Sequence, residues 1–152
     1  MIRLAEVYFK EAEWSFSRYK PTMEEYTKVA VLSSGCMMMS INSLAVIDDP
    51  ISNQDFDWVL SEPPIIKSSL IITRLMDDLA GYGFEEKLSA VHYYYMPENG
   101  VSEEEASAEL RKQEKNAWKV LNKEILHPRE ASTPILKCVV HFTRACHNGA
   151  IH

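Results

Sequence analysis

Residues 65–85 read IIKSSLIITRLMDDLAGYGFE, and this stretch decides the fold that we predict. It begins as a mostly apolar run and continues into Arg74, Asp77 and Asp78 with no proline or glycine between them. Carboxylates that follow such a run into apolar surroundings need a cation or a hydrogen-bonding partner. The stretch therefore predicts a helix from Ile65 to about Tyr82 that brings acidic side chains to a candidate site.

The spacing of the acids admits two interpretations. Asp77 and Glu85 are eight residues apart, which on a helix places them roughly 12 Å apart along the axis and about 80° apart around it. Glu85 is long and leans toward the helix N-terminus, and so toward Asp77. A hard cation such as Mg²⁺ would then bridge these acids to a phosphate held by Arg74. The alternative is a buried salt bridge from Arg74 to Asp77 or Asp78.

Composition limits the classes of protein to consider. The chain has 152 residues and a net charge of −6, which suits one acidic globular domain and argues against a nucleic-acid partner. It contains no apolar run of about 20 residues, so we expect no membrane span. The first residues, MIRLAE, resemble neither a signal nor a transit peptide. The three cysteines lack paired spacing, which favours a reducing compartment, and we expect a cytoplasmic protein.

Helical periodicity extends over the rest of the chain, without strand-like alternation or repeats. The predicted class is therefore all-α, a helical bundle. The expected helices cover about 2–19, 23–44, 54–60, 65–82, 87–96, 102–125 and 135–146, with a loop at 48–50 and a turn at 97–100.

The predicted helix over 23–44 contains an internal weak point. Ser33, Ser34, Gly35 and Cys36 follow one another there, and a glycine beside two serines favours a kink. One interpretation is a close contact between helices at small residues. The other is a bend that turns backbone carbonyls toward a ligand.

The segment from Ile72 to Leu79, followed by Glu85, resembles the second metal motif of class I terpene synthases, (N,D)D(L,I,V)x(S,T)xxxE. Further segments resemble the plant sesquiterpene synthases of that family, in order along nearly the whole chain. These are Glu11–Trp14, Tyr19–Pro21, Asp55–Trp58, Gly100–Ala106, Arg111–Gln113 and Asn116–Lys119.

This resemblance implies a fold and an activity. We expect residues 1–152 to form part of the C-terminal metal-binding domain, an incomplete half of the class I terpenoid synthase fold around an apolar pocket. The implied reaction uses Mg²⁺, with Mn²⁺ as a substitute, to ionise a prenyl diphosphate, above all farnesyl diphosphate. The carbocation that remains after loss of diphosphate then cyclises.

The resemblance also assigns roles to residues of this chain. Asp77 and Glu85 match metal ligands, Asp78 is a less favoured ligand, and Gly81 occupies the usual Ser/Thr ligand position. Arg74 matches the catalytic residue that contacts diphosphate. The expected pocket wall at the helix break comprises Ser33, Ser34, Gly35, Cys36 and Met37.

Three departures from the family pattern shape our expectations for activity. Gly81 removes a hydroxyl ligand, Leu88-Ser89 replaces the usual basic residue, and the family's first aspartate-rich motif is missing, as is its N-terminal domain. We therefore expect a fragment with little or no cyclase activity, and with exposed apolar faces that favour self-association. The alternative is a degenerate, non-catalytic helical module that binds diphosphate weakly or associates with another synthase.

Overall fold

The computed structural model describes residues 2–44, 52–80, 95–126 and 132–149. Within these ranges the chain forms eight α-helices and no β-strand, which confirms the predicted all-α class. The helices are α1 (Ile2–Ser17), α2 (Met23–Ser33), α3 (Cys36–Leu44), α4 (Asn53–Leu60), α5 (Pro64–Ala80), α6 (Met96–Asn99), α7 (Glu103–Leu126) and α8 (Thr133–Gly149).

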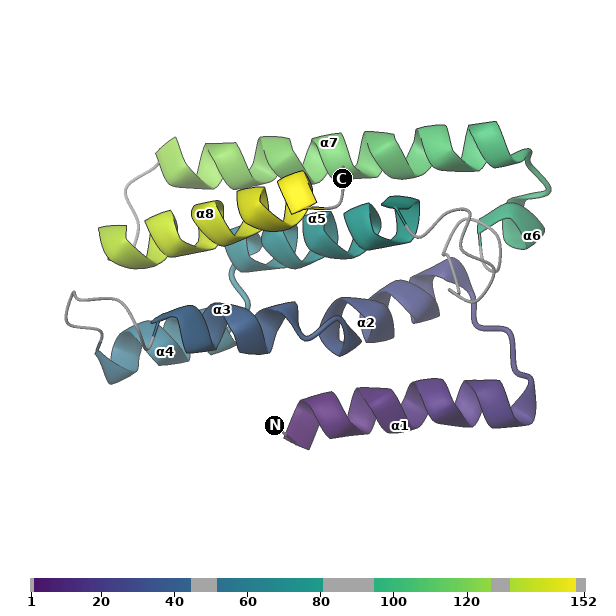
Figure 1. Ribbon diagram of the computed structural model, residues 1–152, viewed down its shortest axis with the longest axis horizontal. Helices are drawn as coiled ribbons and strands as arrows, with labels where there is room; N and C mark the ends of the chain where they lie inside the picture. Colours follow the sequence, from purple (N-terminus) through teal and green to yellow (C-terminus); the bar gives the residue numbers. More distant parts are fainter. Residues whose placement is uncertain (1, 45–51, 81–94, 127–131, 150–152) are drawn as a thin grey trace.

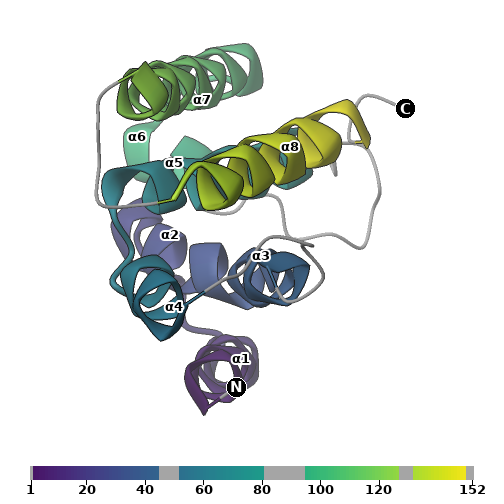
Figure 2. The same ribbon diagram turned by 90° about the vertical axis from the view of Figure 1, so that its left-hand side faces the viewer.

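The helices are stacked in layers around α5 (Figures 1 and 2). The long helix α7 and the C-terminal helix α8 cover one side of α5, and the α2–α3 pair lies on its other side. The N-terminal helix α1 forms the outermost layer and packs against α2. The stretch that decided the predicted fold is therefore the central helix of the bundle.

The apolar half of α5 supplies the middle of the core. Ile65, Ile66, Leu70 and Ile72 are fully buried there, together with Leu121 of α7. Burying one such side chain stabilises the fold by about 1.5–3 kcal/mol. The helix predicted from Ile65 agrees with α5 as far as Ala80, and its expected end at about Tyr82 lies outside the described residues.

The predicted weak point in residues 23–44 is a complete break between two helices. α2 ends at Ser33, α3 begins at Cys36, and Gly35 between them has a φ of +71°. Only glycine adopts that conformation without strain. The Ser34 hydroxyl also donates to the Val31 carbonyl at 2.8 Å, as serine does near helix ends. The expectation of one continuous helix is therefore corrected to two.

The turn that we predicted at 97–100 is also corrected. Met96–Asn99 forms a single helical turn, α6, with a proline at its start and Gly100 in the left-handed region at φ +64°. Proline within the first turn of a helix and glycine just past its last residue are helix-end preferences as well as turn signals. The loop at 48–50 and most of the helix expected at 87–96 lie outside the described residues.

Helix α1 has two apolar faces, of which only one is covered. Trp14 is buried between α1 and α2, whereas Ile2, Phe9 and Phe16 recur every seven residues on the outer face with exposed fractions of 77%, 75% and 95%. Ala5 and Ala12 are exposed between them. A seven-residue apolar repeat is the pattern by which one helix packs along another.

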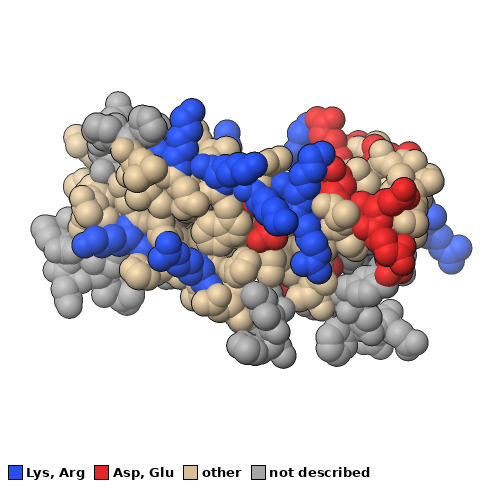
Figure 3. All heavy atoms as spheres, turned by 90° about the horizontal axis from the view of Figure 1, so that it is seen from above, with Lys and Arg blue, Asp and Glu red and all other residues tan. Residues whose placement is uncertain are grey.

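Charges on the surface separate along α7. Figure 3 shows acidic side chains gathered at the end of this face where α7 begins, and basic side chains spread over the rest. The acidic first turn consists of Glu103, Glu104 and Glu105, which suits the positive end of the helix dipole.

In the described part of the chain no helix is both long and apolar enough to cross a membrane.

Candidate metal and diphosphate site

The C-terminal half of α5 holds a buried ion pair between Arg74 and Asp78. Nε of Arg74 donates to Oδ2 of Asp78 at 3.1 Å, and Nη2 of Arg74 makes a short hydrogen bond to Oδ1. The Asp78 side chain is only 1% exposed. The salt-bridge interpretation of the sequence thus applies to Asp78.

A third residue completes this group from another helix. The Tyr26 hydroxyl, presented by α2, accepts a hydrogen bond from Arg74 Nη2 at 2.7 Å and donates one to Asp78 Oδ1 at 2.9 Å. The Arg74 guanidinium carbon also lies 5.6 Å from the centre of the Tyr26 ring. Sequence reasoning missed Tyr26, because nothing in the chain links position 26 to positions 74 and 78.

Burial and the attraction between opposite charges shift the pKa values of Arg74 and Asp78 in opposite directions. Burial raises the pKa of the Asp78 carboxyl, and the Arg74 and Tyr26 hydrogen bonds counter part of that rise. For Arg74, burial lowers the guanidinium pKa, but contact with Asp78 outweighs it, and the net pKa is raised. Arg74 is therefore a permanent cation at the surface end of a buried network.

Asp77 differs sharply from its neighbour Asp78. Its side chain is 50% exposed, and its Oδ2 lies 3.7 Å from Nη1 of Arg74. A half-exposed carboxylate beside a fixed cation is a hard oxygen ligand of the kind that Mg²⁺ prefers, and Mg²⁺ commonly keeps several of its waters. Asp77 therefore fits the donor chemistry of the predicted metal.

The remaining predicted ligand positions, Gly81 and Glu85, lie outside the described residues. Within the part of the chain that the structure describes, no group of three His, Cys, Asp or Glu side chains converges on a metal position. The structure thus brings together Arg74, Asp77 and Asp78, and the metal site itself stays a prediction.

The predicted pocket-wall residues lie at the junction of α2 and α3. Cys36 is buried in the core and Met37 packs against that core. The Ser33 hydroxyl donates to Oε1 of Glu11 on α1 at 2.5 Å. Ser33 therefore ties the helix break to α1, and a role of this junction in a substrate pocket stays a prediction.

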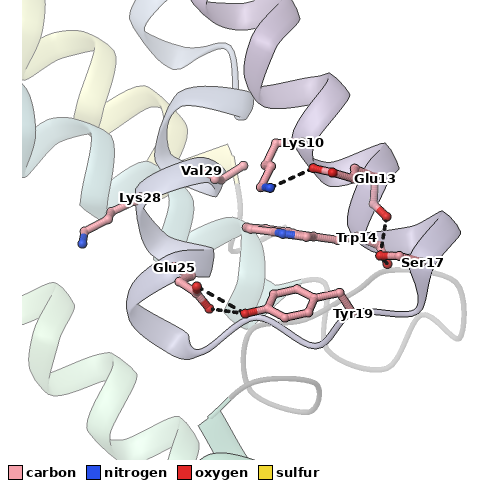
Figure 4. A pocket seen from close by; sticks show the side chains of 8 residues that line it. All are labelled: Lys10, Glu13, Trp14, Ser17, Tyr19, Glu25, Lys28 and Val29. Atoms are coloured by element: carbon pink, nitrogen blue, oxygen red, sulfur yellow. Dashed lines mark hydrogen bonds and ion pairs between the residues drawn. The ribbon is translucent and has the colours of Figure 1, made fainter.

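A cavity of about 420 Å³ lies between α1 and α2 (Figure 4). Trp14 and Tyr19 form its aromatic wall, and Lys10 at its rim pairs with Glu13 at 2.8 Å. The Tyr19 hydroxyl donates to Glu25 at 3.1 Å. Its charged groups balance one another, so the cavity shows no preference for an anionic ligand.

Comparison with known proteins agrees with this geometry. The family described as "Terpene synthase family, metal binding domain" matches residues 1–120. The chain therefore belongs to the terpene synthase family, and the match covers most of this chain. This confirms the resemblance drawn from the second metal motif.

Individual relatives narrow the branch of the family. An (E)-beta-caryophyllene synthase of Origanum vulgare is 74% identical over 144 residues, which cover 95% of this chain and 26% of the relative. A germacrene-D synthase of Ocimum basilicum is 48% identical over 145 residues, with the same two shares covered. These homologues are sesquiterpene synthases, and the chain spans about a quarter of their length.

A solved structure supports the fold. The isoprene synthase of grey poplar (Populus x canescens), in complex with three Mg²⁺ ions and dimethylallyl-S-thiolodiphosphate, superposes with a TM-score of 0.86 at 25% identity. The match covers 97% of this chain and 29% of that one. The helical arrangement is therefore that of class I terpene synthases.

Proposed function

We propose that this chain is the metal-binding part of a Mg²⁺-dependent sesquiterpene synthase that ionises farnesyl diphosphate and cyclises the carbocation with loss of diphosphate. The observation that carries the proposal is the 74% identity to a caryophyllene synthase over 95% of the chain. The grey poplar enzyme, with Mg²⁺ ions and a diphosphate analogue bound, supports the part of the proposal that concerns metal and diphosphate binding. Mn²⁺ as a substitute for Mg²⁺ and a cytoplasmic location belong to the same proposal.

Asp77 and Arg74, both within the described residues, would act at the diphosphate end of the substrate. Asp77, together with Glu85, would hold Mg²⁺, which when bound stabilises negative charge on the departing diphosphate. Arg74 would add a fixed cation beside the same oxygens, with no reorganisation needed as the charge develops. Asp78 keeps Arg74 in place and is the less favoured ligand, because both of its oxygens accept hydrogen bonds from Arg74.

For the chain on its own we propose weak binding without efficient cyclisation. Gly81 offers no hydroxyl to the metal, and the described residues supply only one exposed carboxylate beside Arg74. The same observation favours the second candidate, a non-catalytic helical module that binds diphosphate weakly or associates with another synthase.

Isothermal titration with Mg²⁺ and inorganic diphosphate tests the binding proposal. We expect diphosphate to bind only when Mg²⁺ is present, and Asp77→Ala to abolish that coupled binding. Asp57→Ala is the matched control, because Asp57 is an exposed acid on α4. The binding proposal would be refuted if the unaltered chain did not bind diphosphate, or if Asp77→Ala bound it equally well.

Product analysis tests the expectation that the chain on its own does not cyclise its substrate efficiently. The chain is incubated with farnesyl diphosphate and Mg²⁺, and released terpenes are identified by gas chromatography and mass spectrometry. Efficient turnover would rule out the non-catalytic module. Absence of product together with coupled binding is the result that both candidates predict for the chain on its own.

A further inference from the structure

The guanidinium of Arg74 has two sides with different partners. On one side, Nε and Nη2 donate to Asp78, and Nη2 also donates to Tyr26. On the other side, Nη1 lies 3.7 Å from the Asp77 carboxylate, at the exposed edge of the site. The side that bonds Asp78 and Tyr26 is buried, and the Nη1 side lies next to Asp77, the predicted metal ligand.

Counting donors shows what each partner contributes. A guanidinium has five N–H groups, one on Nε and two on each terminal nitrogen. Asp78 accepts one from Nε and one from Nη2, and Tyr26 accepts the second from Nη2. Three donors are thus used internally, and the two on Nη1 are directed toward the Asp77 side.

Tyr26 is well placed to hold this arrangement. It is buried in a cluster with Ala30, Leu75 and Leu110, so the ring is packed by three helices. Its hydroxyl contacts both members of the ion pair at once. Because Thr22 caps the start of α2 in a capping box with Glu25, the turn that carries Tyr26 is itself anchored.

We propose that Tyr26 is a positioning residue, which fixes the rotation of the Arg74 guanidinium so that Nη1 faces an anionic diphosphate bridged to the metal at Asp77. This inference rests on the proposed function, since it concerns the same diphosphate group. Asp78 alone fixes the plane of the guanidinium. The bond from Tyr26 takes the second Nη2 hydrogen, which would otherwise be available to solvent or to a misplaced anion.

The first test measures Arg74 directly, without any ligand. In ¹⁵N-labelled chain, a guanidinium held on Nε and Nη2 rotates slowly and shows resolved Nη1 and Nη2 signals. Tyr26→Phe keeps the packed ring and removes the hydroxyl, and we expect these signals to broaden or merge. Tyr19→Phe is the matched control, because its hydroxyl also bonds a carboxylate but lies in the α1–α2 cavity (Figure 4).

The second test measures binding of inorganic diphosphate with Mg²⁺ to the same variants. We expect Tyr26→Phe to raise the dissociation constant about threefold to tenfold, equivalent to at most about 1.4 kcal/mol, and Tyr19→Phe to leave it unchanged. Circular dichroism of each variant checks that the helices are intact.

The outcomes separate this inference from the proposed function. Unchanged Arg74 signals in a folded Tyr26→Phe variant overturn the positioning role whatever the ligand does. If Tyr26→Phe alters the Arg74 signals but leaves the diphosphate affinity unchanged, Tyr26 holds Arg74 but does not position it for the ligand, and that part of the proposal is overturned. If the unaltered chain binds no diphosphate, the proposed function fails on its own, and the ligand-free signals still decide whether Tyr26 holds Arg74.

Discussion

Tyr26 on α2 and Arg74 on α5 meet through a 2.7 Å hydrogen bond, although 48 residues separate them in the chain. This contact joins the helix that leads to the Gly35 break to the helix that bears the metal motif. The helix that leads to the predicted pocket wall and the helix that carries the predicted diphosphate contact are therefore joined directly by a hydrogen bond.

The adjacent acids Asp77 and Asp78 should differ strongly in their effect on stability. Asp78→Ala leaves Arg74 largely buried without its main partner, which costs about 3–5 kcal/mol of unfolding free energy. Asp77→Ala removes a half-exposed group and should cost less than about 1 kcal/mol. Urea denaturation followed by circular dichroism measures both, and equal costs would contradict the division of roles.

Gly35 should resist substitution although space surrounds it. A Cβ at this position would meet nothing within 4 Å, so the cost comes from its φ of +71° alone. We expect Gly35→Ala to lower the unfolding free energy by about 1–2 kcal/mol. The neighbouring residue Ser34 has right-handed helical backbone, so Ser34→Ala should lower the unfolding free energy clearly less. A smaller loss for Gly35→Ala than for Ser34→Ala would show that the break does not depend on glycine.

The capping box at the start of α2 predicts a pH dependence. The backbone N–H of Thr22, which donates to Glu25, is the largest cause holding the pKa of that carboxyl below its usual value. The folded-state pKa is depressed, so this stabilisation is present above the unfolded pKa and is lost as the pH falls through the folded one. Carbon-13 NMR of the Glu25 carboxyl should show the lowered pKa.

The Thr22 side chain gives a second measure of the same cap. Thr22→Ala removes the hydroxyl that accepts from the Glu25 N–H at 3.2 Å and should cost about 1 kcal/mol near neutral pH. Urea denaturation at neutral pH measures it. No loss of stability would mean that the cap contributes little to α2.

The outer face of α1 predicts self-association of the chain. Ile2, Phe9 and Phe16 repeat every seven residues and are exposed, and such a stripe pairs with another apolar helix surface. Light scattering after size exclusion should show mass rising with concentration, and Phe9→Lys should reduce it. Leu126→Lys, at an exposed position at the end of α7, is the control. A strict monomer at every concentration would contradict this expectation.

Local sequence patterns predicted most of the fold and part of the site. The apolar run of α5 and the weak point at Gly35 depend on neighbouring residues, so the sequence revealed them. The motif around Asp77 identified the family, and the comparisons confirm it.

Features that depend on distant residues escaped sequence reasoning. The sequence left open which acid pairs with Arg74, because offsets of three and four both suit a helix. Tyr26 settles this in favour of Asp78 from 52 residues away in the chain. The short helix α6 was missed because proline and glycine mark turns and helix ends alike.

The most direct measurement of the central claim uses Mn²⁺ as a paramagnetic substitute for Mg²⁺ in the presence of inorganic diphosphate. We predict that Mn²⁺ broadens the backbone amide signals of residues 74–80 and that Asp77→Ala removes this effect. Broadening at the acidic first turn of α7, Glu103–Glu105, in place of α5, or no diphosphate-dependent broadening, would contradict the account.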